Sequence, residues 1–479
     1  MNLYEVFAAT AQKQCAHAAI VGPNDNDAMT YEALDDAIGL AAAALHAAGV
    51  RQGDTIGLHC PSGAAYIILT YAVWKCGGCV VPIPTELTDA EKQEICREIS
   101  LSFLISDKLK AKTAATQCHP GFAVMPLVPA CEHPHGFHAV NSAFIRFTSG
   151  TTGASKGVVL SHETIHERIH AANEVLHIGP EDRVLWLLSM SYHFAVSIVS
   201  YLSFGATVVL VPNHFAQAVV AAAKKHGATL IYGSPAHYRW MASYQQGAPL
   251  PNLRLAVSTT VALDSATATA FHQRYRLPLT QALGIIEIGL PFINVDFAGD
   301  RGEGIGRLLP SYQMRLVDVG LGPNAKEIYL QGRGMLDAYY RPWRTRSEII
   351  PDGWFHTGDV ASVDADGCVF LRGRTKDVIN VMGMKFFPQE VEAVLISHPG
   401  VKDACVSTVA DARLGEVPVA RIILVESEEE PSEAELQEFC KRQLADYKVP
   451  QQIEIVKELW RTPSGKVIHR TGAQQAATP

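Results

Sequence analysis

Hydroxyl groups, glycines and one lysine are concentrated between residues 147 and 162, in the stretch FTSGTTGASKGVVLSH. The apolar residues on either side predict two strands, 143–147 and 158–160, joined by a polar loop. Glycine lets successive backbone amides approach one anion, and lysine adds a cation, so the loop suits a polyphosphate. An ordinary hairpin without a ligand fits the composition equally well. The residues predicted to hold phosphate are Thr148, Ser149, Gly150, Thr151, Thr152, Gly153 and Lys156.

A second stretch, GWFHTGD at 353–359, ends on the carboxylate of Asp359. A carboxylate can accept hydrogen bonds from both hydroxyls of a ribose, which is what we expect of Asp359. The alternative is a plain turn before a hairpin formed by residues 360–363 and 368–371. Three other kinds of site are excluded. The spacing around Lys156 is not that of a Walker loop, and the glycines at 302–306 are not followed by the helical pattern of a Rossmann dinucleotide site. No GxSxG sequence is present, so nothing indicates a hydrolase nucleophile.

These stretches resemble the signatures of the adenylate-forming superfamily, which includes acyl- and aryl-CoA synthetases, peptide-synthetase adenylation domains and firefly luciferases. FTSGTTGASKG is similar to the family's phosphate loop, and GWFHTGD is similar to its WFxTGD sequence. QALGIIE at 281–287 resembles QGYGMTE, and STTVAL at 258–263 resembles the turn that reads SGAAPL. GRTKD at 373–377 matches the domain junction, and RTPSGK at 461–466 is similar to the TPSGK sequence of the catalytic lysine.

The resemblance implies a role for each matching residue. Lys466 would bridge the carboxylate and the α-phosphate, and Glu287 would hold Mg²⁺ on the phosphates of ATP. Asp359 and Arg374 would hold the nucleoside, and Lys376 would be the hinge. The residues placed at the adenine are Ser258, Ala282 and Leu283, where Leu283 stands in place of the family's tyrosine.

The segment SYHFAVS at 191–197 resembles the part of the family that lines the acid pocket. His193 is included with Lys466 and Glu287 among the predicted catalytic residues, although a histidine beside aromatic residues also fits a packed core. Ala195 stands where amino-acid-activating relatives have an aspartate that holds the ammonium group, so we expect an uncharged acyl or aryl acid. The predicted lining residues are Tyr192, Phe194, Ala195, Val196, Tyr232 and Ile285.

The elements that must position these residues alternate between helices and strands. Apolar spacing predicts a helix over 31–48, a strand over 55–60, a helix over 64–74 and a strand over 80–83, which indicates a mostly parallel sheet. The predicted fold class is α/β, with a large N-terminal domain of several subdomains at 1–374. A small, mobile α+β lid at 375–479 would carry Lys466.

Charge and composition exclude several other classes of protein. The formal net charge of −8 argues against a nucleic-acid partner. Residues 184–223 contain no Asp, Glu, Lys or Arg, but serines, Gly205 and Pro212 interrupt them, so we expect a buried helix and strand and no membrane span. The N-terminus has no signal-peptide pattern and the ten cysteines have no metal-ligand spacing, which predicts a cytoplasmic protein with reduced thiols.

The function implied by the resemblance is ATP-dependent activation of a small carboxylic acid to acyl-AMP, with release of pyrophosphate and transfer of the acyl group to a thiol. The expected cofactors are ATP, Mg²⁺ and coenzyme A, or the phosphopantetheine of an acyl carrier protein. The alternatives are a carrier-protein loader, a luciferase-like oxygenase, and a nucleotide-binding protein in which Leu283 and Ile286 have removed catalysis.

Overall fold

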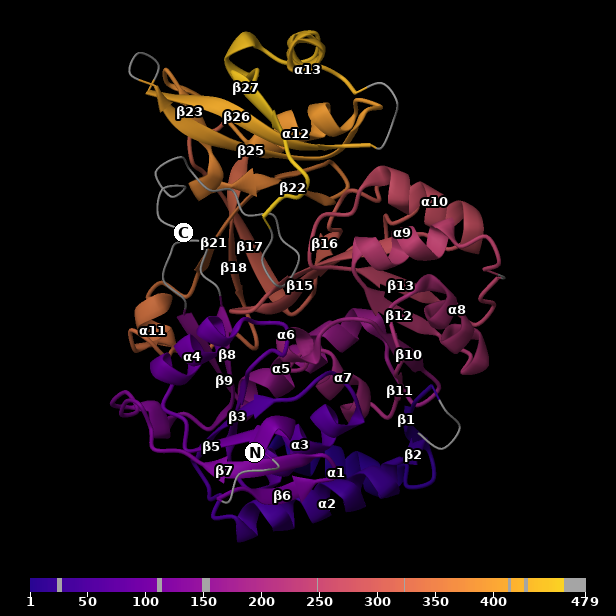
Figure 1. Cartoon of the computed structure of the whole chain (residues 1–479), viewed down its shortest axis with the longest axis vertical. Helices are drawn as coiled ribbons and strands as arrows, with labels where there is room; N and C mark the ends of the chain where they lie inside the picture. The colour runs from indigo at the N-terminus through magenta and orange to yellow at the C-terminus, as the bar shows by residue number, and fades with distance from the viewer. Residues whose placement is uncertain are drawn as a thin grey trace. The chain divides into compact units, whose positions relative to one another are not determined.

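The computed structural model describes residues 1–23, 28–109, 114–148, 156–247, 249–322, 324–411, 415–425 and 430–460. The chain divides into two compact units (Figure 1). The first comprises Met1–Gln313 and Gln331–Trp354, and the second comprises Met314–Leu330 and Phe355–Pro479. The boundary after residue 374 stays a prediction.

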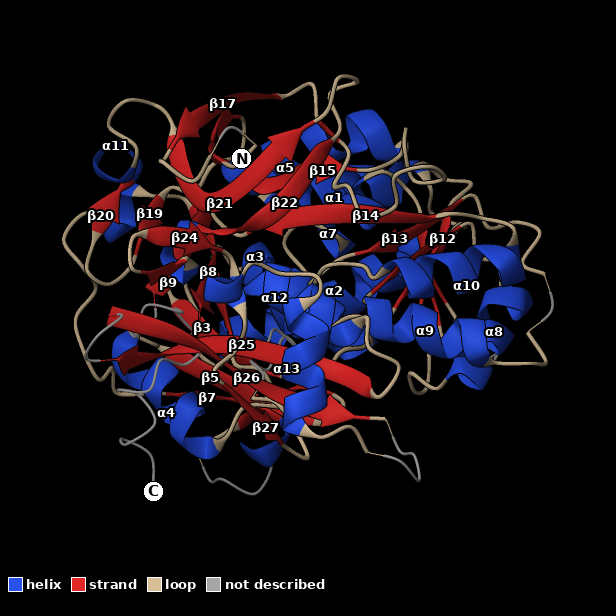
Figure 2. Ribbon diagram, turned by 90° about the horizontal axis from the view of Figure 1, so that it is seen from above, coloured by secondary structure: helices blue, strands red, loops and turns tan. Residues whose placement is uncertain are grey.

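Nine of the described strands form one sheet of the first unit, and its central strands are parallel. In spatial order they are β16 (Arg307–Leu308), β15 (Gly289–Ile293), β14 (Leu279–Ile285), β13 (Leu255–Ser258), β12 (Leu230–Gly233), β10 (Arg183–Trp186), β11 (Thr207–Val209), β1 (Ala18–Val21) and β2 (Met29–Thr30). Helices α8 (Ala216–Lys225), α9 (Pro235–Ser243) and α10 (Ser265–Tyr275) lie beside β12 and β13 in both Figure 1 and Figure 2. Buried parallel strands of this kind read as continuous apolar runs, which explains LAVS in β13 and LIYG in β12.

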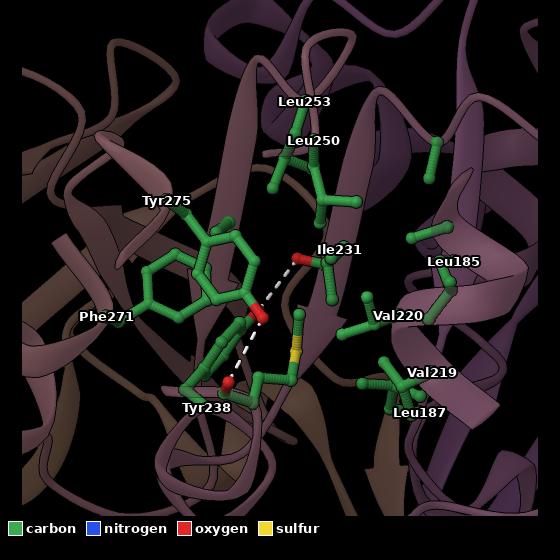
Figure 3. Close-up of a cluster of buried hydrophobic side chains, with 14 of the residues drawn as sticks. Leu185, Leu187, Val219, Val220, Ile231, Tyr238, Leu250, Leu253, Phe271 and Tyr275 are labelled. Atoms are coloured by element: carbon green, nitrogen blue, oxygen red, sulfur yellow. Dashed lines mark hydrogen bonds between the residues drawn. The ribbon is translucent and has the colours of Figure 1, made fainter. Parts of the chain in front are cut away.

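The core between these strands and helices is aromatic on one side and aliphatic on the other (Figure 3). Tyr238 and Phe271 meet edge to face with ring centres 5.2 Å apart. The buried hydroxyl of Tyr238 donates to the carbonyl oxygens of Ile231 and Val257, on β12 and β13. This tyrosine therefore ties α9 to two neighbouring strands without leaving a polar group unsatisfied.

A second sheet of the first unit contains the predicted phosphate hairpin. Nine described strands follow in the order β20 (Arg344–Thr345), β19 (Ala338–Tyr339), β9 (Lys156–Ser161), β8 (Ser142–Thr148), β4 (Cys79–Pro82), β3 (Thr55–His59), β5 (Phe103–Ser106), β7 (Phe122–Pro126) and β6 (Thr116–His119). The remaining helices of this unit are α1 (Leu3–Lys13), α2 (Tyr31–Ala47), α3 (Ala64–Lys75), α4 (Asp89–Glu98), α5 (His162–Leu176), α6 (Met190–His193), α7 (Ile198–Ser203) and α11 (Arg346–Ile349). The hydroxyl of Thr30 accepts a hydrogen bond from the amide of Ala33 and so starts α2, as its residue type predicts.

The described strands of the second unit form two smaller sheets. One has β17 (Tyr312–Asp318), β18 (Lys326–Gly332), β21 (Phe355–Val363) and β22 (Val369–Arg374) in that order. The other has β24 (Met384–Phe386), β23 (Ile379–Val381), β26 (Gly415–Leu424) and β25 (Val401–Asp411), with β27 (Gln452–Ile455) parallel to β26. Its core also takes side chains from α12 (Pro388–Ile396) and α13 (Glu433–Lys441). Ser432 caps α13 by accepting from the amide of Glu435, and serine is a residue type favoured at this position.

The fold class predicted from the sequence is confirmed: a mixed α/β body followed by a small α+β part. The first sheet is parallel in its central strands, whereas the second sheet is parallel only from β8 through β4 and β3 to β5 and antiparallel elsewhere. Alternation of apolar strands with capped helices is a strong local signal, which is why it could be read without a structure. Within the described residues, no helix has the length and apolar character needed to cross a membrane.

Candidate active site

Lys156 is held at the start of β9 by the antiparallel hairpin that the sequence predicts. Residues 148 and 156 face each other across β8 and β9, and the ladder continues to Ser142 and Ser161. The ammonium nitrogen of Lys156 lies 4.7 Å from the ring centre of Tyr339 on β19, a cation–π contact. The loop residues Ser149, Gly150, Thr151, Thr152 and Gly153 lie outside the described residues, as does the side chain of Thr148.

Glu287 lies in the turn between β14 and β15 and contacts the same tyrosine, Tyr339. The hydroxyl of Tyr339 donates a hydrogen bond of 3.1 Å to Oε1 of Glu287. Burial, reinforced by the Glu287 carboxylate, raises the pKa of Tyr339, so this hydroxyl keeps its proton. Lys156 and Glu287 are therefore brought together around one tyrosine that the sequence did not single out.

The turn that carries Glu287 is supported by a buried arginine. Arg168 of α5 is only 1% exposed, and its Nη1 donates a 2.7 Å hydrogen bond to the carbonyl oxygen of Ile286. Its Nε donates to the carbonyl oxygen of Gly334. Sequence reasoning missed Arg168, although a charged residue beside Ile165 and Ile169 on the apolar face of a predicted helix was an available signal.

The residues predicted to contact adenine lie at the ends of two adjacent parallel strands. Ser258 of β13 faces Gln281 of β14, so Ser258, Ala282 and Leu283 are close together. The side chain of Gln281 accepts from the amide of Leu263 at 2.6 Å and donates to the carbonyl oxygen of Glu303 at 3.0 Å. It fixes the 259–263 turn, which is a positioning role that the sequence did not reveal.

The predicted acid-pocket residues differ in exposure. Phe194 is fully buried and its ring centre lies 5.4 Å from that of Tyr66, so Phe194 is part of the core. Tyr232, which is 6% exposed, stacks on Trp186 with ring centres 5.4 Å apart. His193 meets the same Trp186 edge to face at 6.2 Å. Ala195 is buried, whereas Tyr192 and Ile285 keep partly exposed surface.

Asp359 and Arg374, in the second unit, form a direct ion pair. Nε of Arg374 donates a 2.8 Å hydrogen bond to Oδ1 of Asp359, and the two residues face each other across β21 and β22. Asp359 therefore lies inside strand β21 and not in a turn. Gly358, the residue before it, has a positive φ of 72°. Lys376 lies in the short 3₁₀ helix Thr375–Asp377 that follows, and burial lowers its pKa.

The carboxylate chemistry of the first unit fits a magnesium ion held jointly with a substrate. Among the described residues, no group of three or more His, Cys, Asp or Glu side chains is placed to hold a metal. Glu287 makes no ion pair with any described residue, and its carboxylate offers hard oxygen ligands. Mg²⁺ is commonly bound by one or two carboxylates together with substrate phosphates, so a single Glu287 is sufficient. Lys466 lies outside the described residues.

Two family models match this chain. The model for AMP-binding enzymes matches residues 7–340, and the model for the AMP-binding enzyme C-terminal domain matches residues 390–466. The first model covers well over half of the chain and includes the predicted phosphate loop. The second model ends at Lys466, the predicted catalytic lysine.

Individual relatives match along nearly the whole chain. A sulfoacetate–CoA ligase of Cupriavidus necator is 29% identical, over 94% of this chain and 92% of the relative. A feruloyl-CoA synthase of an Amycolatopsis species is 29% identical, over 92% of each chain. The crystal structure of o-succinylbenzoate CoA synthetase from Bacillus subtilis has a TM-score of 0.84 at 23% identity, covering 100% of this chain and 98% of that one, which shows a shared fold.

Proposed function

The chain belongs to the AMP-binding enzyme family, and from this premise we propose that it joins a carboxylic acid to coenzyme A through an acyl-adenylate. A carboxylate oxygen attacks the α-phosphorus of ATP, and the bond to pyrophosphate breaks. The thiol sulfur of coenzyme A then attacks the acyl carbon, AMP leaves, and the thiol proton is released. The enzyme class, an AMP-forming acid–thiol ligase, is the one to which the named relatives belong.

The observation that best supports this proposal is the arrangement of Lys156, Tyr339 and Glu287. The ammonium nitrogen of Lys156 lies 4.7 Å from the ring centre of Tyr339, and the hydroxyl of Tyr339 donates a 3.1 Å hydrogen bond to the Glu287 carboxylate. Adenylation brings two anions together, so the site must neutralise charge on the phosphates. Lys156 would bind the leaving phosphates, and Glu287 would hold Mg²⁺, which supplies further neutralisation when bound.

The second unit would hold the nucleoside and supply the catalytic lysine. The carboxylate of Asp359 is of the kind that suits two ribose hydroxyls. Arg374 orients this carboxylate through a charge-assisted hydrogen bond. Lys466, from the TPSGK sequence, would approach the acid and the α-phosphate during adenylation and withdraw for thioester formation.

The acid is proposed to enter beside Tyr192, His193 and Ile285, and an amino acid is disfavoured. Ala195 provides no carboxylate to hold an ammonium group. The relatives are named for acids as different as sulfoacetate and ferulate, so their names do not choose among acids for this chain. The loader of a carrier protein and the non-catalytic nucleotide-binding protein are not favoured, because the relatives are named as CoA ligases and synthetases.

Pyrophosphate release tests the proposal. The protein is incubated with MgATP and a panel of acids, with coenzyme A, with a phosphopantetheinylated carrier protein, or with neither. We expect acid-dependent pyrophosphate release and a thioester with free coenzyme A. Release that no acid stimulates would contradict an acid ligase, and a thioester formed only on the carrier protein would contradict coenzyme A as the acceptor.

A further inference from the structure

Arg146 is a charged residue in the middle of an otherwise uncharged strand, SAFIRFT of β8. Its neighbours on the strand, Phe144 and Ile145, are almost completely buried in the core. Nη1 of Arg146 donates a 2.6 Å hydrogen bond to the carbonyl oxygen of Tyr192, and the guanidinium carbon lies 5.3 Å from the ring centre of Tyr192. The guanidinium group is thus anchored on the segment that is proposed to line the acid pocket.

The opposite edge of this guanidinium group has no acceptor among the residues that the structure describes. Nε of Arg146 is completely buried and has no hydrogen-bond partner. Arg146 forms no ion pair with any carboxylate in the described part of the chain, and its only hydrogen bond there is the one from Nη1. A buried donor without an acceptor is rare in folded proteins, so an acceptor supplied by a ligand is the simplest completion of this group.

The free edge has the geometry and the charge for an oxyanion. Nε and Nη2 of an arginine point the same way and can bind the two oxygens of a carboxylate or sulfonate together. Burial lowers the pKa of Arg146 to about 10, while Tyr192 and Glu287 act in the opposite direction, so the group remains a cation at neutral pH.

We propose that Arg146 binds an oxyanion on the tail of the acid, so that the substrate is an acid with a second anionic group besides the carboxylate that is activated. This inference rests on the proposed function. It replaces the expectation, based on Ala195 alone, that the acid has an uncharged tail. The anchor of Arg146 is the backbone of Tyr192, in the proposed pocket, whereas Lys156 and Glu287 converge on Tyr339. We therefore assign the tail of the acid to Arg146 and the phosphates to Lys156 and Glu287.

Matched pairs of acids test this assignment. Pyrophosphate release is measured with propanoate and malonate, butanoate and succinate, and benzoate and phthalate, in the wild type, Arg146→Met and Arg146→Lys. We expect the wild type to have the higher kcat/KM for the dianionic member of at least one pair. In Arg146→Met this preference should fall by at least about tenfold, because a charge-assisted hydrogen-bonded pair is lost. Arg146→Lys keeps the charge but not the edge with two donors. Its preference for the dianionic acid should therefore lie between those of the wild type and Arg146→Met.

The monoanionic acid is the internal control, since its kcat/KM in Arg146→Met should stay near the wild-type value if the variant is folded. A surface arginine, Arg239 on α9, is the matched control, because its side chain is 63% exposed and Arg239→Met should leave both substrates unaffected. Equal wild-type rates for the members of every pair would overturn the inference and leave the proposed function standing. An equal loss of kcat/KM for both acids of a pair in Arg146→Lys would also overturn the inference, because Arg146 would then act on the carboxylate that reacts. If no acid at all releases pyrophosphate, the proposed function itself is contradicted.

Discussion

At the scale of single residues, Tyr339 determines how Glu287 is presented. Its hydroxyl donates to Oε1 of Glu287, and its ring faces the ammonium group of Lys156. In Tyr339→Phe the ring remains but one hydrogen bond to a carboxylate is lost, worth about 1 kcal/mol. We therefore expect kcat/KM for MgATP to fall about fivefold, measured by pyrophosphate release at varied MgATP.

The adjacent tyrosine provides a matched control for this substitution. The hydroxyl of Tyr340 accepts from the amide of Ser100 at 3.1 Å and contacts His133, away from Glu287. Tyr340→Phe should change stability and leave the MgATP dependence as it is. Equal effects of the two substitutions on kcat/KM for MgATP would remove the proposed role of Tyr339.

The site could be read from the sequence only where its residues lie in short local signatures. Lys156 and Glu287 stand in such signatures, and the structure places both next to Tyr339. Tyr339 is 52 positions from Glu287, and Arg168 is 118 positions from Ile286. Contacts of this kind come from strand order and packing, which no local pattern encodes. Arg146 was missed for the same reason, since its partner Tyr192 lies 46 positions away.

At the scale of elements, Asp182 joins three segments of the first sheet and should make stability depend on pH. It accepts from Nε of Arg254 at 2.9 Å and from the hydroxyl of Thr229 at 2.6 Å. Burial acts to raise the pKa of Asp182, but the hydrogen bonds from Arg254, Thr229 and Gly179 outweigh it and hold this pKa below the usual value. A depressed carboxyl pKa stabilises the fold above the unfolded-state pKa, and the stabilisation is lost as pH falls through the folded-state value.

Urea unfolding of the wild type and Asp182→Asn measures this contribution. At pH 7 the variant should be less stable by roughly 2 kcal/mol, because hydrogen bonds to a charged acceptor are lost. Below about pH 3.9, where an unfolded aspartate is protonated, the difference should shrink steadily. Asp296→Asn is the control, since the pair Asp296–Arg307 is about half exposed and should contribute little. A difference between wild type and Asp182→Asn that stays constant down to pH 2 would contradict the assignment.

Elements with strong local signals were predictable, and those set by neighbouring strands were not. Thr30 and Ser432 cap helices as their residue types predict, and the strand predicted over 55–60 is the fully buried β3 (TIGLH). One interpretation of GWFHTGD was a plain turn before a hairpin. In the structure β21 runs from Phe355 to Val363 instead, and Asp359 pairs with Arg374 on β22, a partner that no local pattern reveals.

At the scale of the whole molecule, the proposed mechanism requires the C-terminal part to adopt two positions about Lys376. Proline fixes φ and removes an amide donor, so Lys376→Pro should restrict the backbone where rotation is proposed. We expect thioester formation to slow more than adenylate formation, measured by rapid-quench kinetics of both steps. Lys376→Ala, which keeps the backbone free, should leave the ratio of the two rates near that of the wild type. Unchanged thioester kinetics in Lys376→Pro would place the hinge elsewhere.

Lys466 should act in one half-reaction only. Lys466→Ala should lower the rate of adenylation at least about tenfold, since a cation that stabilises developing charge is removed. Transfer to coenzyme A from acyl-AMP supplied in advance should stay close to the wild-type rate. An equal loss in both steps would show that the lysine has a structural or a different catalytic role.

The central claim, formation of an acyl-adenylate, is tested most directly by weighing the bound product. The protein is mixed with MgATP and the acid that gives the largest pyrophosphate release, without a thiol, and examined by native mass spectrometry. We expect a bound mass equal to the acid plus AMP minus water. When coenzyme A is added, this mass should disappear and AMP and the thioester should be formed. Nucleotide bound without an added acid mass, or release of phosphate in place of pyrophosphate, would contradict it.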